Sequence, residues 1–430
     1  MELHFLSTKN QNPYAVRWAK FGSGERMPFF ISTATGMPLD AVTFWVVAAR
    51  RALGKQPNTL SNEIRSLMYL FLWADARGVS VRDRVRDGTF LSLSETLDIA
   101  NFCSRSMSDA LAEIEERSSN LFKLDRRRKL NVPGVGSGEK RNRLSTIRSF
   151  LEFTSSDVLS NLAQWPPRWQ LYNEARAHFL EILDGQIAGL AKSNRDDLGL
   201  PEGLEAAAIS RLRAVIEPDH PENPFKPEVR FRNYVMVRLL LDVGIRRGEL
   251  LGIKVSDCKL GSSGTITVHR RPDDPDDPRR NKPATKTAAR VLALGGRMTE
   301  IVHEWIVHHR AEIPNARRSP FLIVNSRDGQ PMSLSNINKM MEALRKRVPD
   351  LPTDLSPHLL RHSWNDAFSE VMDEKGVSED QEIKWRMRLM GWRAESSARH
   401  YLRRTIRRRS NEVLMEMQDK MTIAMPDIQE

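Results

Sequence analysis

Apolar residues recur at helical spacing along most of this chain. Leu60, Ile64, Leu67 and Phe71 lie three or four residues apart, and the glycine at position 78 follows them. This spacing predicts a helix that ends at Gly78. The same period predicts further helices from residue 41 onward, near 92–118, through 140–153 and near 170–191. The first half of the chain is therefore expected to be helical.

A polar stretch over 192–204 lacks this period and is rich in turn-forming residues, so we place an inter-domain linker there. Beyond it, Phe231–Leu241 is strongly apolar and predicts a helix. Thr265–Val268 and Arg290–Ala293 predict a strand pair, with the run Pro272–Pro278 at the tip of their hairpin. Helices are expected from there to the end. The predicted fold class is mainly α with a small antiparallel β-sheet.

These patterns divide the chain into three parts. Residues 1–39 are polar, are broken by glycine and proline, and are expected to form an extension with a short hairpin. Residues 40–195 are predicted to form a helical domain, and residues 204–430 a second domain with a tail helix at its C-terminal end. An apolar stripe in the tail, near Ser410–Met421, fits docking on a neighbouring subunit or packing on its own domain, and both interpretations stay open.

Composition indicates a polyanionic partner. The formal net charge is +11, with Lys+Arg 66 against Asp+Glu 55, and the pI is about 9.8. Such an excess favours nucleic acid as the partner. Cys103 and Cys258 fit neither a disulfide framework nor a metal site, which indicates a reducing compartment. Neither a signal peptide nor a membrane span is predicted, so we expect a cytoplasmic, nucleoid-associated protein of a prokaryote, with no membrane partner.

The strongest local signal for chemistry is a helix start in the second domain. Ser356 is a suitable N-cap and Pro357 suits the first helical position, so His358 and Arg361 fall on one face of the first turn. The free N–H groups of a helix N-terminus attract anions, and we expect phosphate there. His358 and His362 also have a zinc-binding spacing, but Arg361 would set a cation beside the metal, so no metal is predicted.

A second candidate segment is a glycine turn between two helices. Arg246 or Arg247 could bind a phosphate through its planar guanidinium, and Glu249 could orient it. The alternative is a solvated basic turn with a glutamate partner.

Two further segments supply proton-transfer groups. Lys286 lies at the start of the returning strand, where a cation-rich pocket would lower its pKa and let it protonate a leaving alkoxide. Lys282 is a competing candidate, and for each of them a surface lysine is the alternative. Tyr401 lies among cations that favour its phenolate, and Trp392 can donate its indole N–H to a phosphate. Their alternatives are a helix-surface tyrosine and a core tryptophan.

Taken in order, these motifs resemble those of the tyrosine recombinases, the phage integrase family. The shared pattern is Gly-x-Arg-x-x-Glu-Leu, a hairpin lysine, His-x-Leu-Arg-His, and a His or Trp nine residues before a tyrosine. It covers roughly residues 225–405. The matching positions here are Arg246, Glu249, Lys286, His358, Arg361, Trp392 and Tyr401. The family more often has histidine where Trp392 stands. The helical segment at 41–190 is similar to the family's core-binding domain.

This resemblance implies a site-specific recombinase or integrase that cleaves and rejoins DNA without metal, ATP or another cofactor. Tyr401 would attack a DNA phosphate to form a 3′-phosphotyrosyl link, and Lys286 would protonate the departing 5′ oxygen. The two arginines, with His358 and Trp392, would neutralise the developing charge. His358 would also assist proton transfer at the tyrosine.

The implied partner is double-stranded DNA, bound by a homotetramer during strand exchange and by a monomer or dimer when the protein is free. Basic residues expected to contact DNA are Lys140, Arg141, Arg143 and Arg247. Two alternatives stay open: a catalytically silent DNA-binding relative, and relaxation of DNA by the related type IB topoisomerase chemistry.

Overall fold

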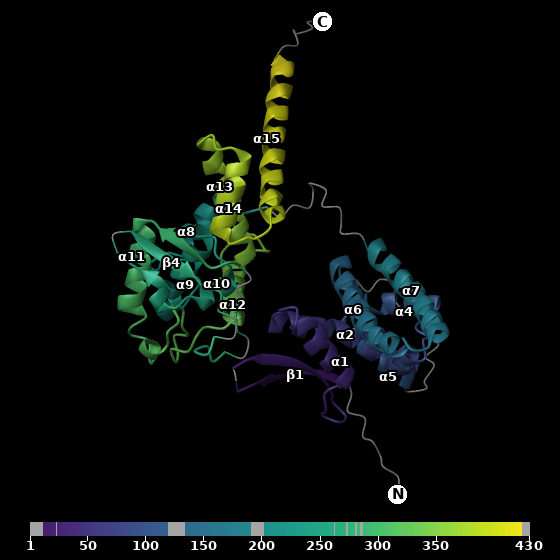
Figure 1. Cartoon of the computed structure of the whole chain (residues 1–430). Coiled ribbons are helices and arrows are strands. Elements are labelled where there is room, and N and C mark those ends of the chain that lie inside the picture. Colours follow the sequence, from purple (N-terminus) through teal and green to yellow (C-terminus); the bar gives the residue numbers. More distant parts are fainter. Residues whose placement is uncertain are drawn as a thin grey trace. The chain divides into compact units, whose positions relative to one another are not determined.

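A computed structural model describes residues 12–22, 24–118, 134–190, 202–261, 263–271, 274–279, 282–283 and 287–423. The chain forms two compact units, residues 1–194 and 195–430. Helices dominate the described residues of both units, which also hold a two-stranded and a three-stranded antiparallel sheet (Figure 1). The predicted fold class, mainly α with small antiparallel sheets, is confirmed.

The first unit opens with a hairpin that packs on helices. Strands β1 (Tyr14–Lys20) and β2 (Arg26–Ser32) pair antiparallel, as the predicted short hairpin requires. Met27 and Phe30 of β2 are buried in the same apolar cluster as the helices of this unit. The described part of residues 1–39 therefore contributes to the core of the helical unit.

The remaining elements of the first unit are α1 (Asp40–Trp45), the π-helical turn η1 (Val46–Arg51), α2 (Pro57–Arg77), α3 (Val81–Arg86), α4 (Leu93–Phe102), α5 (Met107–Ser118), α6 (Ser137–Asn161) and α7 (Pro166–Gly189). As predicted, α2 ends at Gly78, which adopts the left-handed conformation with φ 64°. The helical region expected near 92–118 is divided because the Ser106 hydroxyl accepts from the Asp109 N–H and starts a new helix.

The second unit contains α8 (Ala206–Val215), α9 (Pro227–Asp242), α10 (Arg247–Gly252), η3 (Val255–Asp257), β3 (Cys258–Lys259), β4 (Gly264–Val268), β5 (Arg290–Leu294), α11 (Gly296–Glu304), η4 (Trp305–His309), η5 (Ala316–Arg318), α12 (Leu334–Arg347), α13 (Pro357–Glu374), α14 (Glu379–Met390) and α15 (Glu395–Ile423). The apolar helix and the strand pair predicted from the sequence are α9 and β4–β5. The short strand β3, which the sequence pattern did not reveal, pairs with β4.

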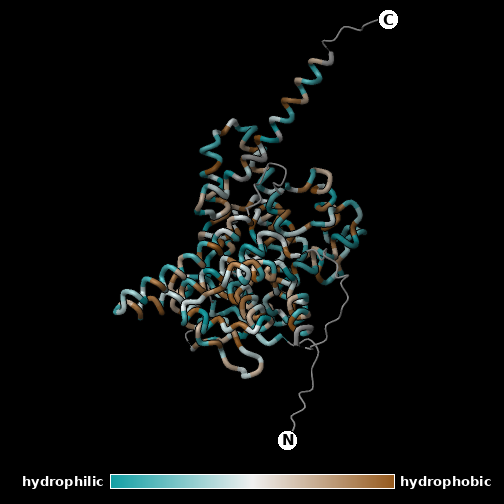
Figure 2. Tube along the Cα trace, turned by 90° about the vertical axis from the view of Figure 1, so that its right-hand side faces the viewer, coloured by the Kyte–Doolittle hydropathy of each residue, from teal (hydrophilic) through white to brown (hydrophobic). Residues whose placement is uncertain are grey.

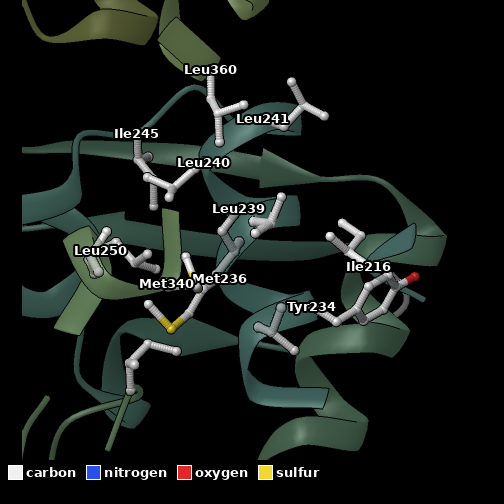
Figure 3. Packing of buried hydrophobic residues seen from close by; sticks show 14 of the residues in the cluster. Ile216, Tyr234, Met236, Leu239, Leu240, Leu241, Ile245, Leu250, Met340 and Leu360 are labelled. Carbon is white, nitrogen blue, oxygen red and sulfur yellow. The ribbon is translucent and has the colours of Figure 1, made fainter. Parts of the chain in front are cut away.

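Helix α9 runs through the core of the second unit and fixes the segments that follow it. Its Leu240 packs in one buried cluster with Ile245 and Leu250, which flank the turn into α10 (Figure 3). Leu360, from the first turn of α13, belongs to the same cluster. The core therefore anchors both segments that carry the candidate arginines.

Ion pairs and a hydrogen bond hold the described residues of the connection between β4 and β5. Asp274 is buried and pairs with Lys254 at 2.9 Å, and its backbone carbonyl accepts from Lys282 Nζ at 2.6 Å. Asp277 is also buried and pairs with Arg279 at 2.8 Å. The acidic run predicted as a hairpin tip thus turns two of its carboxylates inward.

Helix α15 carries apolar side chains into solvent along its second half. In Figure 2 hydrophobic positions alternate with hydrophilic ones along this helix. The exposed residues are Val413, Leu414, Met415, Met417 and Met421. Of the two interpretations of the tail stripe, packing on its own unit is not observed for these side chains.

Candidate active site

The start of α13 has the geometry predicted from the sequence. The Ser356 hydroxyl accepts from the Leu359 N–H at 3.3 Å, and Pro357 occupies the first helical turn. This cap sets Arg361 inward, where only 1% of its surface is exposed, whereas His358 remains accessible.

Arg361 joins three segments that are distant in sequence. Its Nη1 donates to the Gly244 carbonyl, and its Nη2 donates to the Met390 carbonyl at 3.4 Å. Its guanidinium lies 5.4 Å from the centroid of the Trp392 ring. Burial, and then the charge of Arg246, lower the pKa of Arg361 to about 9, so it is still a cation at neutral pH. A fixed, desolvated cation of this kind suits a phosphate oxygen.

The turn that precedes Arg246 requires glycine at position 244. Gly244 has φ +66°, and a Cβ there would lie 2.7 Å from the Trp364 ring. The Trp364 indole N–H donates to the Asp242 carbonyl at 3.1 Å, which holds the ring against this turn. Glycine is therefore required both for the backbone conformation and for the close approach.

Arg246 and Arg247 differ in accessibility and partners. Arg246 is the N-cap residue of α10, and 34% of its side chain is exposed. Arg247 is exposed and donates to Asn338 Oδ1 at 2.9 Å. Of the two, Arg246 is the one whose charge acts on both His358 and Arg361, so it shares their site.

Glu249 has a partner that the sequence pattern did not reveal. It accepts from the Arg246 backbone N–H at 2.9 Å but lies 3.5 Å from the Arg246 guanidinium. Its closest cation is Arg290, at 2.8 Å, and Thr287 also donates to it. Burial raises the pKa of Glu249, but the hydrogen bond and charge of Arg290 outweigh this effect and lower it to about 2.

Arg290 is the main functional-site residue missing from the sequence prediction. It lies on an inward-facing position of β5, and its Nε donates to the Leu389 carbonyl at 2.6 Å. An arginine at the buried phase of an alternating strand is a sequence signal that could have identified it. Arg290 and Glu249 together link β5, α10 and the end of α14 behind Arg246.

The hairpin lysine is not placed by the structure. Lys286 lies outside the described residues, so its role stays a prediction. Lys282, the competing candidate, is buried and donates to the Asp274 carbonyl within the β4–β5 connection. Because Lys282 stabilises this connection, Lys286 is the preferred candidate for the acid that protonates the leaving group.

Tyr401 is held in a buried aromatic contact. Only 6% of its surface is exposed, and its ring stacks on Trp392 with centroids 5.5 Å apart and an interplanar angle of 13°. The Arg386 guanidinium lies 5.5 Å from the Tyr401 ring centroid. The Tyr401 hydroxyl lies 3.0 Å from Nδ1 of His362, the last residue of the His-x-Leu-Arg-His pattern, for which the sequence predicted no catalytic role.

His358 is affected by the charges of three arginines. Partial desolvation lowers its pKa, and the charges of Arg361, Arg246 and Arg247 lower it further. Its ring centroid lies 4.4 Å from that of His362. A neutral imidazole among three cations can still donate an N–H to an anion, which is the property that a phosphate-binding histidine needs.

Arg143, one of the residues predicted to contact DNA, has its guanidinium bound within the first unit. Arg143 is buried on α6, and its Nη1 donates to the carbonyls of Cys103 at 3.0 Å and Arg105 at 2.7 Å. Its guanidinium also lies 3.8 Å from the centroid of the Tyr69 ring. These contacts hold the Arg143 guanidinium in the interior of the first unit. Lys140 and Arg141, on the same helix, are half-buried, and their contact with DNA stays a prediction.

Described residues of the second unit thus bring two arginines, a neutral histidine, a tryptophan and a tyrosine hydroxyl into one connected cluster. Residues 218–408 match the family model of the phage integrase family. Over residues 218–408 the chain therefore matches the phage integrase family, which confirms for this part of the chain the resemblance inferred from the motifs.

Curated relatives are named as tyrosine recombinases. The chain is 28% identical over 160 residues to tyrosine recombinase XerD of Halalkalibacterium halodurans, covering 37% of this chain and 46% of that protein. It is 25% identical over 224 residues to tyrosine recombinase XerC of Staphylococcus carnosus, covering 52% of this chain and 58% of that protein. The chain thus spans about half the length of the curated relatives that it matches.

Solved structures give a weaker likeness. A XerH site-specific recombinase bound to its difH substrate has a TM-score of 0.37 and 15% identity, over 80% of this chain and 96% of that chain. The Tn1549 transposon integrase with circular intermediate DNA has a TM-score of 0.39 and 14% identity, over 72% of this chain and 94% of that chain. Scores below 0.5 do not establish a common arrangement of whole chains. Within the described residues, no helix combines the length and apolarity needed to cross a membrane.

Proposed function

We propose that this protein is a site-specific DNA recombinase or integrase that cleaves and rejoins DNA through a 3′-phosphotyrosyl intermediate. The observation that carries the proposal is the position of Tyr401, whose ring stacks on Trp392 while Arg361 lies over the same tryptophan. A protein that only binds DNA has no need for a tyrosine held beside a buried arginine. The phage integrase match over residues 218–408 supports the same conclusion.

In the proposed reaction, the Tyr401 oxygen attacks the scissile phosphorus and the bond from phosphorus to the 5′ oxygen breaks. Arg361 and Arg246 stabilise the negative charge that develops on the non-bridging oxygens, with His358 and Trp392 as N–H donors. Lys286 is the proposed acid that protonates the departing 5′ oxygen. Attack by a 5′-hydroxyl of another strand reverses these steps and reseals the DNA, so neither ATP nor metal is required.

DNA binding is proposed to use the net positive charge of the chain. Arg247 is exposed beside the candidate site, and Lys140 and Arg141 start helix α6 of the first unit. Phosphate contacts of this kind release counterions, so affinity should fall steeply with salt. The protein is expected to act on DNA at the nucleoid of a prokaryotic cytoplasm.

The active assembly is proposed to be a tetramer on two synapsed duplexes, with a monomer or dimer in the free state. Its support is the exposed apolar side chains of α15, among them Val413, Met417 and Met421. A helix that presents several large apolar side chains to solvent is suited to burial against another subunit.

The proposal is tested by covalent capture. The protein is mixed with a library of nicked duplexes of random sequence, in which cleavage releases a short fragment and prevents resealing. Denaturing gels then detect DNA that stays attached to protein. The wild type should yield adducts and the Tyr401→Phe variant none, with nearly unchanged DNA affinity, because only the hydroxyl is removed.

Two outcomes separate the rival functions. DNA retention without any adduct would identify a DNA-binding relative that lacks catalysis. If adducts form, plasmids that carry two copies of the recovered sequence distinguish recombined products from circles that are only relaxed.

A further inference from the structure

The Tyr401 hydroxyl and the His362 ring face each other in a buried contact. Tyr401 Oη lies 3.0 Å from His362 Nδ1, within the range for direct proton transfer through a hydrogen bond. The two residues are 6% and 5% exposed, and they come from different helices, α15 and α13. The contact therefore depends on tertiary packing and is shielded from bulk water.

Surrounding groups fix the phenol in this position. The Tyr401 ring stacks on the Trp392 ring. The Arg386 guanidinium lies 5.5 Å from the centroid of the Tyr401 ring. Arg386 is fully buried and is held by hydrogen bonds to Asn365 and by an ion pair with Glu382. A cation beside the ring also favours the phenolate that forms when the proton leaves.

The two histidines of α13, His358 and His362, have different neighbours. Partial desolvation lowers the pKa of His358, and the charges of Arg361, Arg246 and Arg247, the first two of which are proposed to bind the phosphate, lower it further. His362 follows one turn later and contacts the Tyr401 hydroxyl. The expectation that His358 assists proton transfer at the tyrosine is therefore better met by His362.

We propose that His362 is the catalytic base that accepts the Tyr401 proton during cleavage; this inference rests on the proposed function. In the neutral imidazole that carries its proton on Nε2, Nδ1 is the acceptor of the hydrogen bond from the phenol and can take its proton. The Oη–H bond breaks as Nδ1 gains the proton, the Oη–phosphorus bond forms, and the bond to the 5′ oxygen breaks. The 5′ oxygen takes its proton from a separate acid. During rejoining, the imidazolium returns its proton to Tyr401.

The test uses His362→Asn. An asparagine amide can occupy the place of Nδ1 and hydrogen-bond to the phenol, but it cannot accept a proton at neutral pH. With the duplex recovered most often by covalent capture, single-turnover cleavage by this variant should be slower by about 100-fold or more, the usual contribution of a general base. His303→Asn, an exposed histidine of α11, is the matched control and should cleave at the wild-type rate.

A duplex with sulfur in place of the bridging 5′ oxygen locates the step that is affected. A thiolate leaves without a proton, so a defect in the leaving-group acid is relieved by sulfur and a defect at the nucleophile is not. The variant should stay slow on the sulfur duplex, whereas Lys286→Ala should recover. Recovery of His362→Asn on this substrate would overturn the proposal.

Rapid cleavage by the substituted protein would also overturn it. If His362→Asn cleaves as fast as the wild type, the histidine only positions the phenol. His362→Ala with added imidazole gives a second measurement, in which a rate that rises with imidazole concentration supports the base and a rate independent of imidazole contradicts it. Absence of adducts in both the wild type and His303→Asn would instead refute the proposed function itself.

Discussion

Removal of the negative charge on Glu249 should destabilise the second unit in a pH-dependent way. Glu249 is 2% exposed and pairs with Arg290 at 2.8 Å. Burial opposes its ionisation, but Arg290 lowers its pKa from 4.5 to about 2. This difference of roughly 2.5 pKa units corresponds to about 3 kcal/mol of stability at pH 7. Glu249→Gln should therefore lower the free energy of unfolding by about that amount.

The sign of the pH effect follows from the depressed pKa of Glu249. Its contribution is fully present above the unfolded value of 4.5 and is lost as pH falls toward 2. At pH 3 the wild-type advantage over Glu249→Gln should have fallen to about 1.4 kcal/mol. Urea titrations at both pH values, read by pulsed hydrogen exchange of peptides from residues 225–260, measure this difference.

The matched control is Glu300→Gln, because the ion pair of Glu300 with Arg297 is exposed at 69% on each side chain. Its effect on stability should be close to zero, because water and salt screen an exposed ion pair. A stabilising Glu249–Arg290 pair is ruled out if Glu249→Gln lowers the free energy of unfolding no more than this control at pH 7, or by the same amount at pH 3 and pH 7.

Three other substitutions test different parts of the molecule. A Cβ at Gly203 would lie 2.6 Å from Ser363 Cα, so Gly203→Ala should lower the melting temperature, whereas Gly252→Ala, with open space around it, should not. Arg143→Gln should destabilise the first unit by about 2 kcal/mol and leave the salt dependence of DNA binding unchanged, as urea and filter-binding titrations would show. Met417→Asp should reduce assembly on DNA in mass photometry without lowering the melting temperature, and unchanged assembly would argue against the tail interface.

Local sequence rules predicted the helices and the cap of the candidate site well. The apolar period located α2 and α9, and Ser356 with Pro357 fixed the start of α13. These features depend on neighbours within a few residues, which the sequence displays directly. The strand pair was predictable for the same reason, because alternation over five residues identifies each strand.

Contacts between distant segments were beyond these rules. Glu249 was expected to orient Arg246, but its closest cation is Arg290, which is 41 residues away in the chain. Arg143 was expected to face DNA, but tertiary packing places it over Tyr69. In both cases a buried arginine contacts a partner that no local pattern indicates.

Mapping the covalent bond between protein and DNA shows whether Tyr401 is the nucleophile. After covalent capture on nicked duplexes, protease digestion and mass spectrometry identify the peptide that carries a nucleotide. We expect a single modified site, Tyr401, joined to a 3′-phosphate with a free 5′-hydroxyl on the released strand. Attachment at any other residue, or a link to a 5′-phosphate, would contradict this expectation.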